Sequence, residues 1–241
     1  MTLTYIFHSA FAIECKTCTL IIDFWRDAQT ETYKEGFVKD YLLKKETPIY
    51  VLSSHFHGDH FNPEILKWKN KNPNITYIFG KDILIEQLAD LNDANYLDKG
   101  DSYKDNLITI KAFGSTDSGI SFLINIENKT LFHAGDLNNW HWSDEANPEE
   151  SKEAENNYLK ELAILQKDIS VIDLAMFPVD NRMGSDYDRG AKQFIEAIDV
   201  KKFAPMHFGR QYDAANAFEK VAKQHGTEFL KITHIGQQFE I

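Results

Sequence analysis

A dense group of metal-type donors limits what this chain can fold into, because residues 55–60 read His-Phe-His-Gly-Asp-His. Polar side chains of this kind have no packing role that demands such density. Imidazole and carboxylate together suit zinc, iron or manganese. The fold must therefore present this segment, which we call the histidine loop (residues 55–60), where a metal ion can reach it.

The residues on either side of the histidine loop indicate its setting. Residues 49–52 read Ile-Tyr-Val-Leu, which predicts a buried strand. The sequence Asn62-Pro63-Glu64 has an Asn cap, a proline at the first helical position and an acid in the first turn, which predicts a helix start. The histidine loop therefore connects a strand end to a helix, the position at which α/β proteins place their chemistry.

The charge balance restricts the partners of the chain. Its 241 residues carry a formal net charge of −11, which repels polyanions, so we do not expect nucleic acid as a partner.

The N-terminal residues resemble no signal peptide, and no apolar run has the length of a transmembrane helix. Two cysteines, Cys15 and Cys18, fit a reducing compartment. We expect a cytoplasmic protein that does not contact a membrane.

Hydrophobic periodicity predicts strands in runs, followed by strands that alternate with helices. This ordering predicts two mixed sheets packed together with helices outside, in a single domain over residues 1–241. The expected strands cover 3–14 (two strands with a turn near His8-Ser9), 20–25, 49–53, 75–79, 107–112, 120–126, 130–133, 171–177, 202–206 and 229–240. The expected helices cover 37–43, a segment from Asn62, 81–91, 147–167, 188–198 and 213–224.

Two distant strand ends carry further donors. Asp136 follows Gly135 at the end of the strand 130–133, and His207 ends the strand 202–206 just before Gly209. A metal ion takes about three or four protein ligands, so one loop cannot complete two sites. Asp136 and His207 are therefore the candidates that complete them.

The order of these motifs resembles the metallo-β-lactamase superfamily. The resemblance rests on His55-x-His57-x-Asp59-His60, then Gly135-Asp136, then a strand-terminal His207, with Asp23 after an early buried strand. Within that superfamily the chain looks most like the branch of metal-dependent hydrolases that contains ascorbate-6-phosphate lactonase. The segments 7–11 (Phe-His-Ser-Ala-Phe) and 205–207 (Pro-Met-His) suggest this placement.

The resemblance implies an αββα sandwich with the site at one edge, between the sheets. It implies one or two divalent ions, zinc or alternatively manganese or iron. A metal-activated hydroxide would be the nucleophile, and Asp59 would act as a catalytic residue that orients water or accepts its proton. One ion would be held by His55 and His57, the other by Asp59, His60 and His207, with Asp136 bridging the two.

One superfamily ligand is absent. A further histidine usually precedes the bridging aspartate, yet residues 113–119 contain none. Asp117, Ser115, Thr116 or water are candidates to replace it, and a carboxylate there would favour manganese or iron. His133 and His141 are the other candidates. His133 is more simply interpreted as a histidine that orients a ligand, and His8 as a turn residue near the site.

Other side chains suggest a substrate pocket. Trp140, beside His141 and Trp142, follows Asp136 closely enough to line one. Arg182 and Arg210 are candidates to bind an anionic small molecule, since guanidinium groups match carboxylate and phosphate. A homo-oligomer is left open by the sequence.

Three functions are compatible with these residues. The leading interpretation is a metal-dependent hydrolase that acts on a small ester, lactone or phosphoester. The alternatives are a nuclease of the same superfamily and a non-catalytic metal or ligand sensor. The acidic charge argues against the nuclease.

Overall fold

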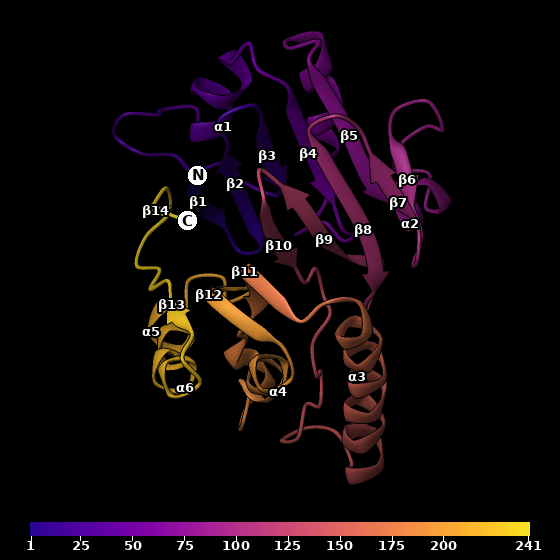
Figure 1. The fold of residues 1–241 in the computed structure, drawn as a ribbon, viewed down its shortest axis with the longest axis vertical. Coiled ribbons are helices and arrows are strands. Elements are labelled where there is room, and N and C mark those ends of the chain that lie inside the picture. The colour runs from indigo at the N-terminus through magenta and orange to yellow at the C-terminus, as the bar shows by residue number, and fades with distance from the viewer.

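The computed structural model describes residues 1–241 and contains two mixed seven-stranded sheets (Figure 1). The first has the order β14-β1-β2-β3-β4-β5-β6, and the second has the order β13-β12-β11-β10-β9-β8-β7. The first sheet contains β1 (Thr2–Phe7), β2 (Ala10–Glu14), β3 (Thr19–Ile22), β4 (Ile49–Ser53), β5 (Ile75–Gly80), β6 (Asn95–Leu97) and β14 (Gln238–Glu240). The second contains β7 (Ser102–Lys104), β8 (Ile108–Gly114), β9 (Ile120–Ile126), β10 (Lys129–His133), β11 (Val171–Pro178), β12 (Asp199–Met206) and β13 (Glu228–Phe229).

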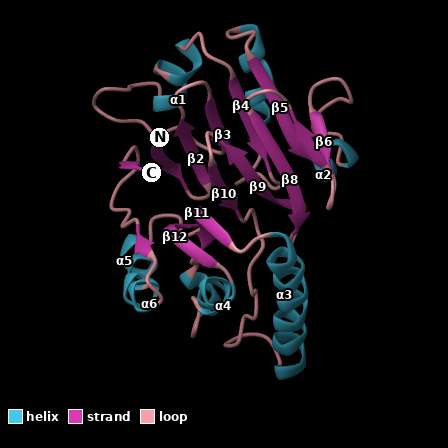
Figure 2. Ribbon diagram, in the orientation of Figure 1, coloured by secondary structure: helices cyan, strands magenta, loops and turns pink.

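Helices cover the outer faces of both sheets, which confirms the predicted αββα sandwich (Figure 2). The α-helices are α1 (Phe37–Asp40), α2 (Lys81–Ile85), α3 (Pro148–Asp168), α4 (Arg189–Ala197), α5 (Tyr212–Ala217) and α6 (Glu219–Gln224). Three 3-10 helices are η1 (Leu42–Lys44), η2 (Pro63–Asn70) and η3 (Asn181–Met183). No helix combines the length and the apolar character that crossing a lipid bilayer requires.

The central strands are buried on both faces. In β4, Tyr50 and Leu52 belong to the core that includes the space between the sheets, whereas Ile49 and Val51 pack against the helices of the first sheet. Successive side chains of a strand point to opposite faces, so a strand with two buried faces is apolar throughout. This explains why residues 49–52 appear in the sequence as an unbroken apolar run.

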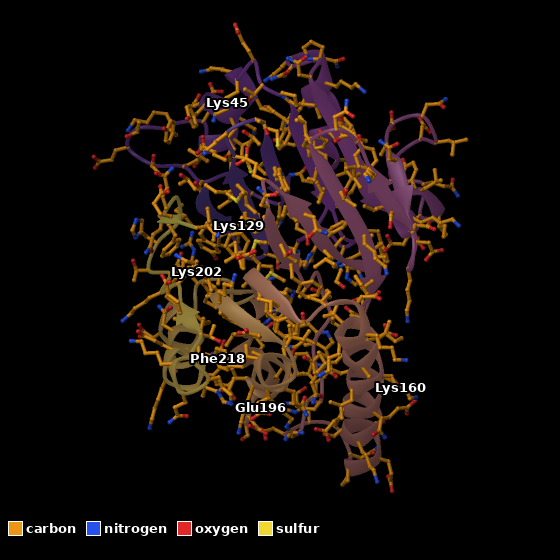
Figure 3. All side chains as sticks on the ribbon, viewed as in Figure 1. Lys45, Lys129, Lys160, Glu196, Lys202 and Phe218 are labelled. Carbon is orange, nitrogen blue, oxygen red and sulfur yellow. The ribbon has the colours of Figure 1, made fainter.

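Helix α3 shows how the outer layer is built. Asn147 and Glu150 form a capping box at its start, and Tyr158, Leu162 and Leu165 form its buried stripe. The Tyr158 hydroxyl donates a hydrogen bond to the carbonyl of Gly190, which ties α3 to α4. Exposed charged side chains such as Lys160 project from the opposite face of the helix (Figure 3).

The segment from Asn62 starts as predicted but forms a 3-10 helix. The Asn62 side chain accepts the Glu64 N–H, as an N-cap does. The Tyr77 hydroxyl then donates to the Ile65 carbonyl and accepts the Lys69 N–H at 3.2 Å. In an α-helix the Ile65 carbonyl would accept the Lys69 N–H directly. A side chain from β5 therefore replaces the α-helical hydrogen bond, a long-range effect that local propensity does not contain.

Several other predicted elements are shorter or broken, among them the expected helix 37–43, which is divided into α1 and η1. Helix α2 ends at Ile85, because Gln87 adopts a left-handed φ of 59°. The expected helix 213–224 is divided at Phe218 into α5 and α6. The expected strand 229–240 is wrong, because Phe229 ends β13 in the second sheet while 238–240 pairs with β1 in the first. The chain changes sheets there and brings its two termini together (Figure 1).

Candidate metal centre

The candidate site gathers at the carboxyl ends of strands from both sheets. Each contributing side chain follows its strand within a few residues, which is where α/β folds present reactive groups. The contributors are His8 after β1, Asp23 after β3, the histidine loop after β4, Asp136 after β10, Asp180 after β11 and His207 after β12. Residues far apart in the sequence are therefore neighbours in space.

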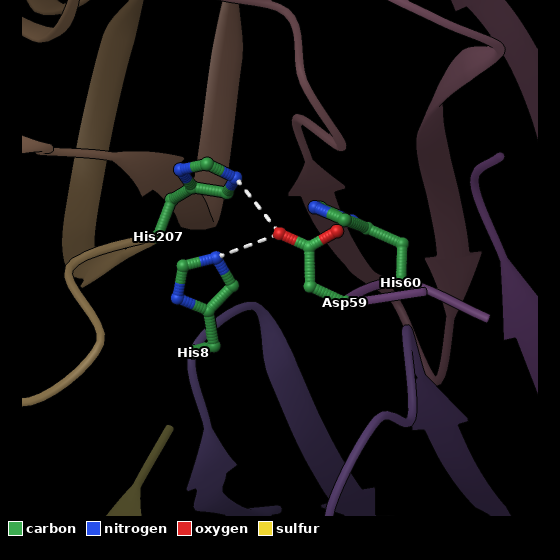
Figure 4. Close-up of side chains that lie close together, drawn as sticks. All are labelled: His8, Asp59, His60 and His207. Atoms are coloured by element: carbon green, nitrogen blue, oxygen red, sulfur yellow. Dashed lines mark ion pairs between the residues drawn. The ribbon is translucent and has the colours of Figure 1, made fainter. Parts of the chain in front are cut away.

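One donor group consists of His8, Asp59, His60 and His207 (Figure 4), whose ligand atoms lie within 4.8 Å of one another. Asp59 Oδ2 lies 3.3 Å from His8 Nε2 and 3.8 Å from His207 Nε2. A second donor group consists of His55, His57 and Asp136. The sequence proposed six of these seven residues as ligands and missed His8 as a member.

Asp136 lies between the two groups. Its Oδ1 is 3.1 Å from His60 Nε2 and 3.4 Å from His207 Nε2, while its Oδ2 is 3.4 Å from His55 Nε2. One carboxylate thus presents one oxygen to each group. This is the placement that a bridging ligand needs.

The residues present fit divalent cations. His60 Nε2, His207 Nε2 and Asp136 Oδ1 are buried and have no hydrogen-bond partner, although buried polar atoms nearly always have one. His55 Nε2 and His57 Nδ1 approach to 3.1 Å, and two nitrogen lone pairs at that distance repel unless a proton or cation lies between them. Imidazole nitrogen and carboxylate oxygen are ligands of zinc, iron and manganese.

Three histidines each donate a hydrogen bond from Nδ1 to a buried acceptor, and these bonds orient the Nε2 atoms towards the centre. His60 Nδ1–H donates to Asp23 at 2.7 Å, and His207 Nδ1–H donates to Asp180 at 2.9 Å. The Ser54 hydroxyl donates to Asp23, so it accepts His55 Nδ1–H at 3.0 Å. In each neutral ring the proton therefore belongs on Nδ1, which leaves Nε2 as the nitrogen that can bind a cation at the centre, as in metal-binding histidines.

Asp180 is a functional residue that the sequence interpretation missed. It is buried, and Arg182 Nε donates to its Oδ1 at 2.9 Å. Its position two residues after the apolar strand β11 matches that of Asp136 after β10 only loosely, so spacing alone gave little signal. Burial raises the pKa of its carboxyl, but His207 and Arg182 outweigh this and lower the pKa to about 2.

The charges within the cluster are strongly coupled. Burial alone would lower the pKa of His60, but Asp136 and Asp23 hold that pKa well above its usual value. Burial would raise the pKa of Asp136, and the imidazoles of His60 and His207 instead hold it well below the usual range. A cation that binds His60 must therefore displace a proton that the two carboxylates favour.

The side chains that were candidates to replace the absent histidine ligand lie in different settings. Asp117 Oδ2 lies 3.8 Å from His57 Nδ1, so it is beside the second donor group but half exposed. The Thr116 hydroxyl bonds the backbone of Asn138 as donor and acceptor. Ser115 Oγ lies 3.4 Å from the Asp117 N–H, which donates to it. Asp117 is therefore the one of these three side chains that stands next to the second group.

His133 and His141, the other candidates, offer no free ring nitrogen to a metal ion in this arrangement. Both rings are buried, and both of their nitrogens already bond protein groups. His133 bonds the Ser9 carbonyl and the Gly135 N–H, and His141 bonds the Asp186 carbonyl and the Ser143 N–H. His133 instead supports the site from behind, 3.7 Å from Asp23.

A cavity of about 290 Å³ opens onto the two donor groups. Trp140 lies along it, with its ring 5.3 Å from that of His207 and its indole N–H bonded to the Asp136 carbonyl at 2.8 Å. Arg182 also lines it. The lining residues are His57, Asp59, Thr116, Asp117, Asp136, Trp140, Trp142, Arg182 and His207.

Arg210, the other arginine of the substrate-pocket prediction, does not line this cavity. It borders a separate, larger cavity together with Trp25, Arg26 and Tyr212. The cause is local, since Gly209 adopts a left-handed φ of 57° directly after Phe208 and turns the chain. The larger cavity is lined by none of the seven residues of the two donor groups.

Comparison with known proteins gives consistent matches. The chain is 24% identical to a UPF0173 metal-dependent hydrolase of Desulforamulus reducens, over the whole of both chains. Among solved structures, the metallo hydrolase Igni18 of Ignicoccus hospitalis has a TM-score of 0.69 at 18% identity, with 100% of this chain and 98% of that chain covered. CmlA, a diiron β-hydroxylase of Streptomyces venezuelae, has a TM-score of 0.67 at 13% identity, with 100% of this chain but 54% of the hydroxylase covered.

A family model described as a beta-lactamase superfamily domain matches residues 2–152, which is more than half of the chain. The matched part contains the histidine loop and Asp136, whereas His207 lies beyond it. The finer likeness to the lactonase branch stays a prediction. The fold, the donor groups at the strand ends and this match together establish that the chain belongs to the metallo-β-lactamase superfamily.

Proposed function

We propose that this protein is a metal-dependent hydrolase that cleaves a small ester, lactone or phosphoester with one or two divalent ions. The observation that carries this proposal is Asp136, whose two oxygens face two groups of imidazole nitrogens, with His60 Nε2 and His207 Nε2 buried and without a hydrogen-bond partner. The names of the relatives support the reaction class, since the Desulforamulus protein and Igni18 are both called hydrolases.

Each residue of the centre has a separate task in this proposal. His60, His207, Asp59 and Asp136 would hold one ion, and His55, His57 and Asp136 the other. Bound divalent metal lowers the pKa of a coordinated water and polarises the bond to be cleaved. Asp59 is about one-third exposed at the cavity, so its carboxylate can also orient the attacking water. Its pKa is held below the usual range, because the nearby histidines outweigh burial, so it is ionised at neutral pH.

The identity of the metal depends on the second donor group. His55 and His57 supply imidazole nitrogen, and the adjacent Asp117 adds a hard carboxylate. A hard carboxylate favours manganese or iron over zinc at that position, and His57 and Asp117 are partly exposed, whereas His60, His207 and Asp136 of the first group are buried. We therefore propose that zinc fills the first group and that the second exchanges its metal more readily.

The cavity supports a small substrate with negative charge. A volume of about 290 Å³ is at the lower end for ligand pockets, and the faces of Trp140 and Trp142 supply its apolar wall. The Arg182 side chain is 60% exposed at the rim, although Nε and Nη2 of its guanidinium bond Asp180. Its remaining donors can bind a carboxylate or phosphate.

Arg182→Ala should raise the KM for an anionic ester roughly 10- to 100-fold, because a charge-assisted hydrogen bond is lost. The KM for a neutral ester of equal size should change little. Steady-state kinetics on the matched pair of substrates, with metal content checked, measure this. Arg210→Ala is the control, since Arg210 borders the other cavity. Equal losses on both esters would show that Arg182 acts only through Asp180.

The hydrolase proposal is tested by elemental analysis together with assays on lactone, phosphomonoester, phosphodiester, β-lactam and RNA substrates. We expect bound divalent metal and turnover of at least one small ester or lactone, abolished by chelator and restored by metal. RNA cleavage without small-molecule turnover would identify a nuclease instead. Tightly bound metal with no turnover of any class would identify a sensor.

A further inference from the structure

The buried histidines of the centre differ in what their Nδ1 atoms do. In His55, His60 and His207, Nδ1 faces an acceptor and carries the proton. In His8, His133 and His141, Nδ1 accepts a hydrogen bond from a backbone N–H, that of Gly209, Gly135 and Ser143 respectively. His8, His133 and His141 are therefore protonated on Nε2, which is the tautomer opposite to that of the other three histidines.

This difference decides the chemistry of the Nε2 atoms. A neutral imidazole whose Nδ1 accepts a hydrogen bond must carry its proton on Nε2, which is then a donor with no lone pair for a metal. His133 and His141 use this donor on the carbonyls of Ser9 and Asp186. His8 Nε2 has no hydrogen-bond partner, and it lies 3.3 Å from Asp59 Oδ2 in the first donor group.

The protein holds the His8 ring firmly in this orientation. The residue is 5% exposed and adopts a left-handed φ of 58°, which is uncommon for residues other than glycine. Its N–H donates to the Tyr5 hydroxyl at 2.9 Å, and its carbonyl accepts the His207 N–H at 3.1 Å. Trp25 packs edge-on against its ring. Strain of this kind is characteristic of positions that serve function.

We propose that His8 is a substrate-binding hydrogen-bond donor of the centre, and not the fourth ligand of the first donor group. Its Nε2–H donates to an oxygen of the carbonyl or phosphoryl group under attack, beside Asp59 (Figure 4). This rests on the proposed hydrolytic function. A ligand role would require His8 to break its bond with Gly209 N–H and change tautomer.

A donor that meets developing negative charge contributes about 10²- to 10³-fold to kcat. His8→Asn removes the donor at the Nε2 position, and Asn tolerates the left-handed φ. His8→Gln places an amide N–H near that position. We expect His8→Asn to lose about 10²- to 10³-fold in kcat with little change in KM, and His8→Gln to keep part of the activity. His225→Asn, at an exposed histidine, is the control.

Three readouts are independent of turnover. Long-range ¹H–¹⁵N correlation spectra of the zinc-loaded protein should show His8 protonated on Nε2, and His60 and His207 protonated on Nδ1. Zinc affinity of His8→Asn should stay within about threefold of wild type, whereas His207→Ala should lose more than about 100-fold. Inorganic phosphate should bind zinc-loaded His8→Asn roughly tenfold more weakly than wild type and bind His8→Gln nearly normally.

Two results would overturn the assignment: loss of the Nε2 proton of His8 on zinc loading, and a fall in zinc affinity as large as in His207→Ala. Unchanged phosphate binding and unchanged kcat in His8→Asn would also refute it. Failure of the proposed function looks different. The wild-type protein would then turn over none of the substrates, while the tautomer, zinc and phosphate results for His8 remained as expected.

Discussion

Asp136→Asn should leave at most one metal ion bound and lower the hydrolytic rate by at least 10³-fold. The replacement has the same shape, but its amide presents one oxygen and one NH₂ group, and the NH₂ group cannot bind a cation. If the NH₂ group replaces Oδ1, the first donor group loses the oxygen that lies 3.1 Å from His60 and 3.4 Å from His207. If it replaces Oδ2, the second group loses the oxygen that lies 3.4 Å from His55. Losing a supporting residue already costs about 10- to 100-fold in metal affinity, so losing a shared ligand should cost more.

Elemental analysis and isothermal titration with zinc measure this effect. Asp173→Asn is the matched control, since Asp173 lies on the same sheet and pairs with Lys201 at 2.9 Å, away from the centre. The metal-free Asp136→Asn protein should still fold, because the amide keeps the shape of the carboxylate, although it loses the charge that holds the pKa of His60 above its usual value. Two tightly bound ions in this variant would contradict a bridging role for Asp136.

Asp23→Ala should have the largest effect on stability, about 3–5 kcal/mol, because it removes one partner of a buried charged network. Asp23 is fully buried and accepts hydrogen bonds from the Ser54 N–H, the Ser54 hydroxyl and His60 Nδ1, each at 2.7 Å. Alanine leaves these three donors without an acceptor. It must also adopt the left-handed φ of 48° that Asp23 has.

Urea denaturation of the metal-free proteins measures the loss, with Asp23→Asn as the milder variant that keeps the shape. The pH dependence has a definite sign. Burial would raise the pKa of Asp23, but His133 and His60 lower it below the usual value. Its contribution is therefore present at neutral pH and is lost as the pH falls towards the folded-state pKa. A cost below about 1 kcal/mol at neutral pH would mean that water replaces the carboxylate.

The sequence predicted those parts of the protein that local patterns determine. The apolar run 49–52 and the other predicted strands led to the expectation of two sheets, which the structure contains. The match over residues 2–152 confirms the predicted family. His55, His57, Asp59 and His60 stand together in the sequence and therefore stand together in space. Asp136 and His207 were accessible because each ends a predicted strand.

The remaining features depend on contacts between distant segments. The 3-10 form of η2 follows from Tyr77 on β5, and no pattern within 63–70 reveals it. Asp180 acquires a role only because β11 lies beside β12, which carries His207. Arg210 was misplaced because the turn at Gly209 sends it into another cavity. Side-chain direction after a turn is a property of the assembled fold.

The hydrogen bond between His8 and Gly209 spans 201 positions of the chain. During synthesis the N-terminal segments leave the ribosome first, and β1 then exists without the segment that fixes His8. His207 also belongs to this late segment, so the first donor group cannot be complete until β12 has been made and paired. The first donor group should therefore hold metal tightly only after β12 has paired, and a nascent chain stalled before His207 should retain zinc only weakly.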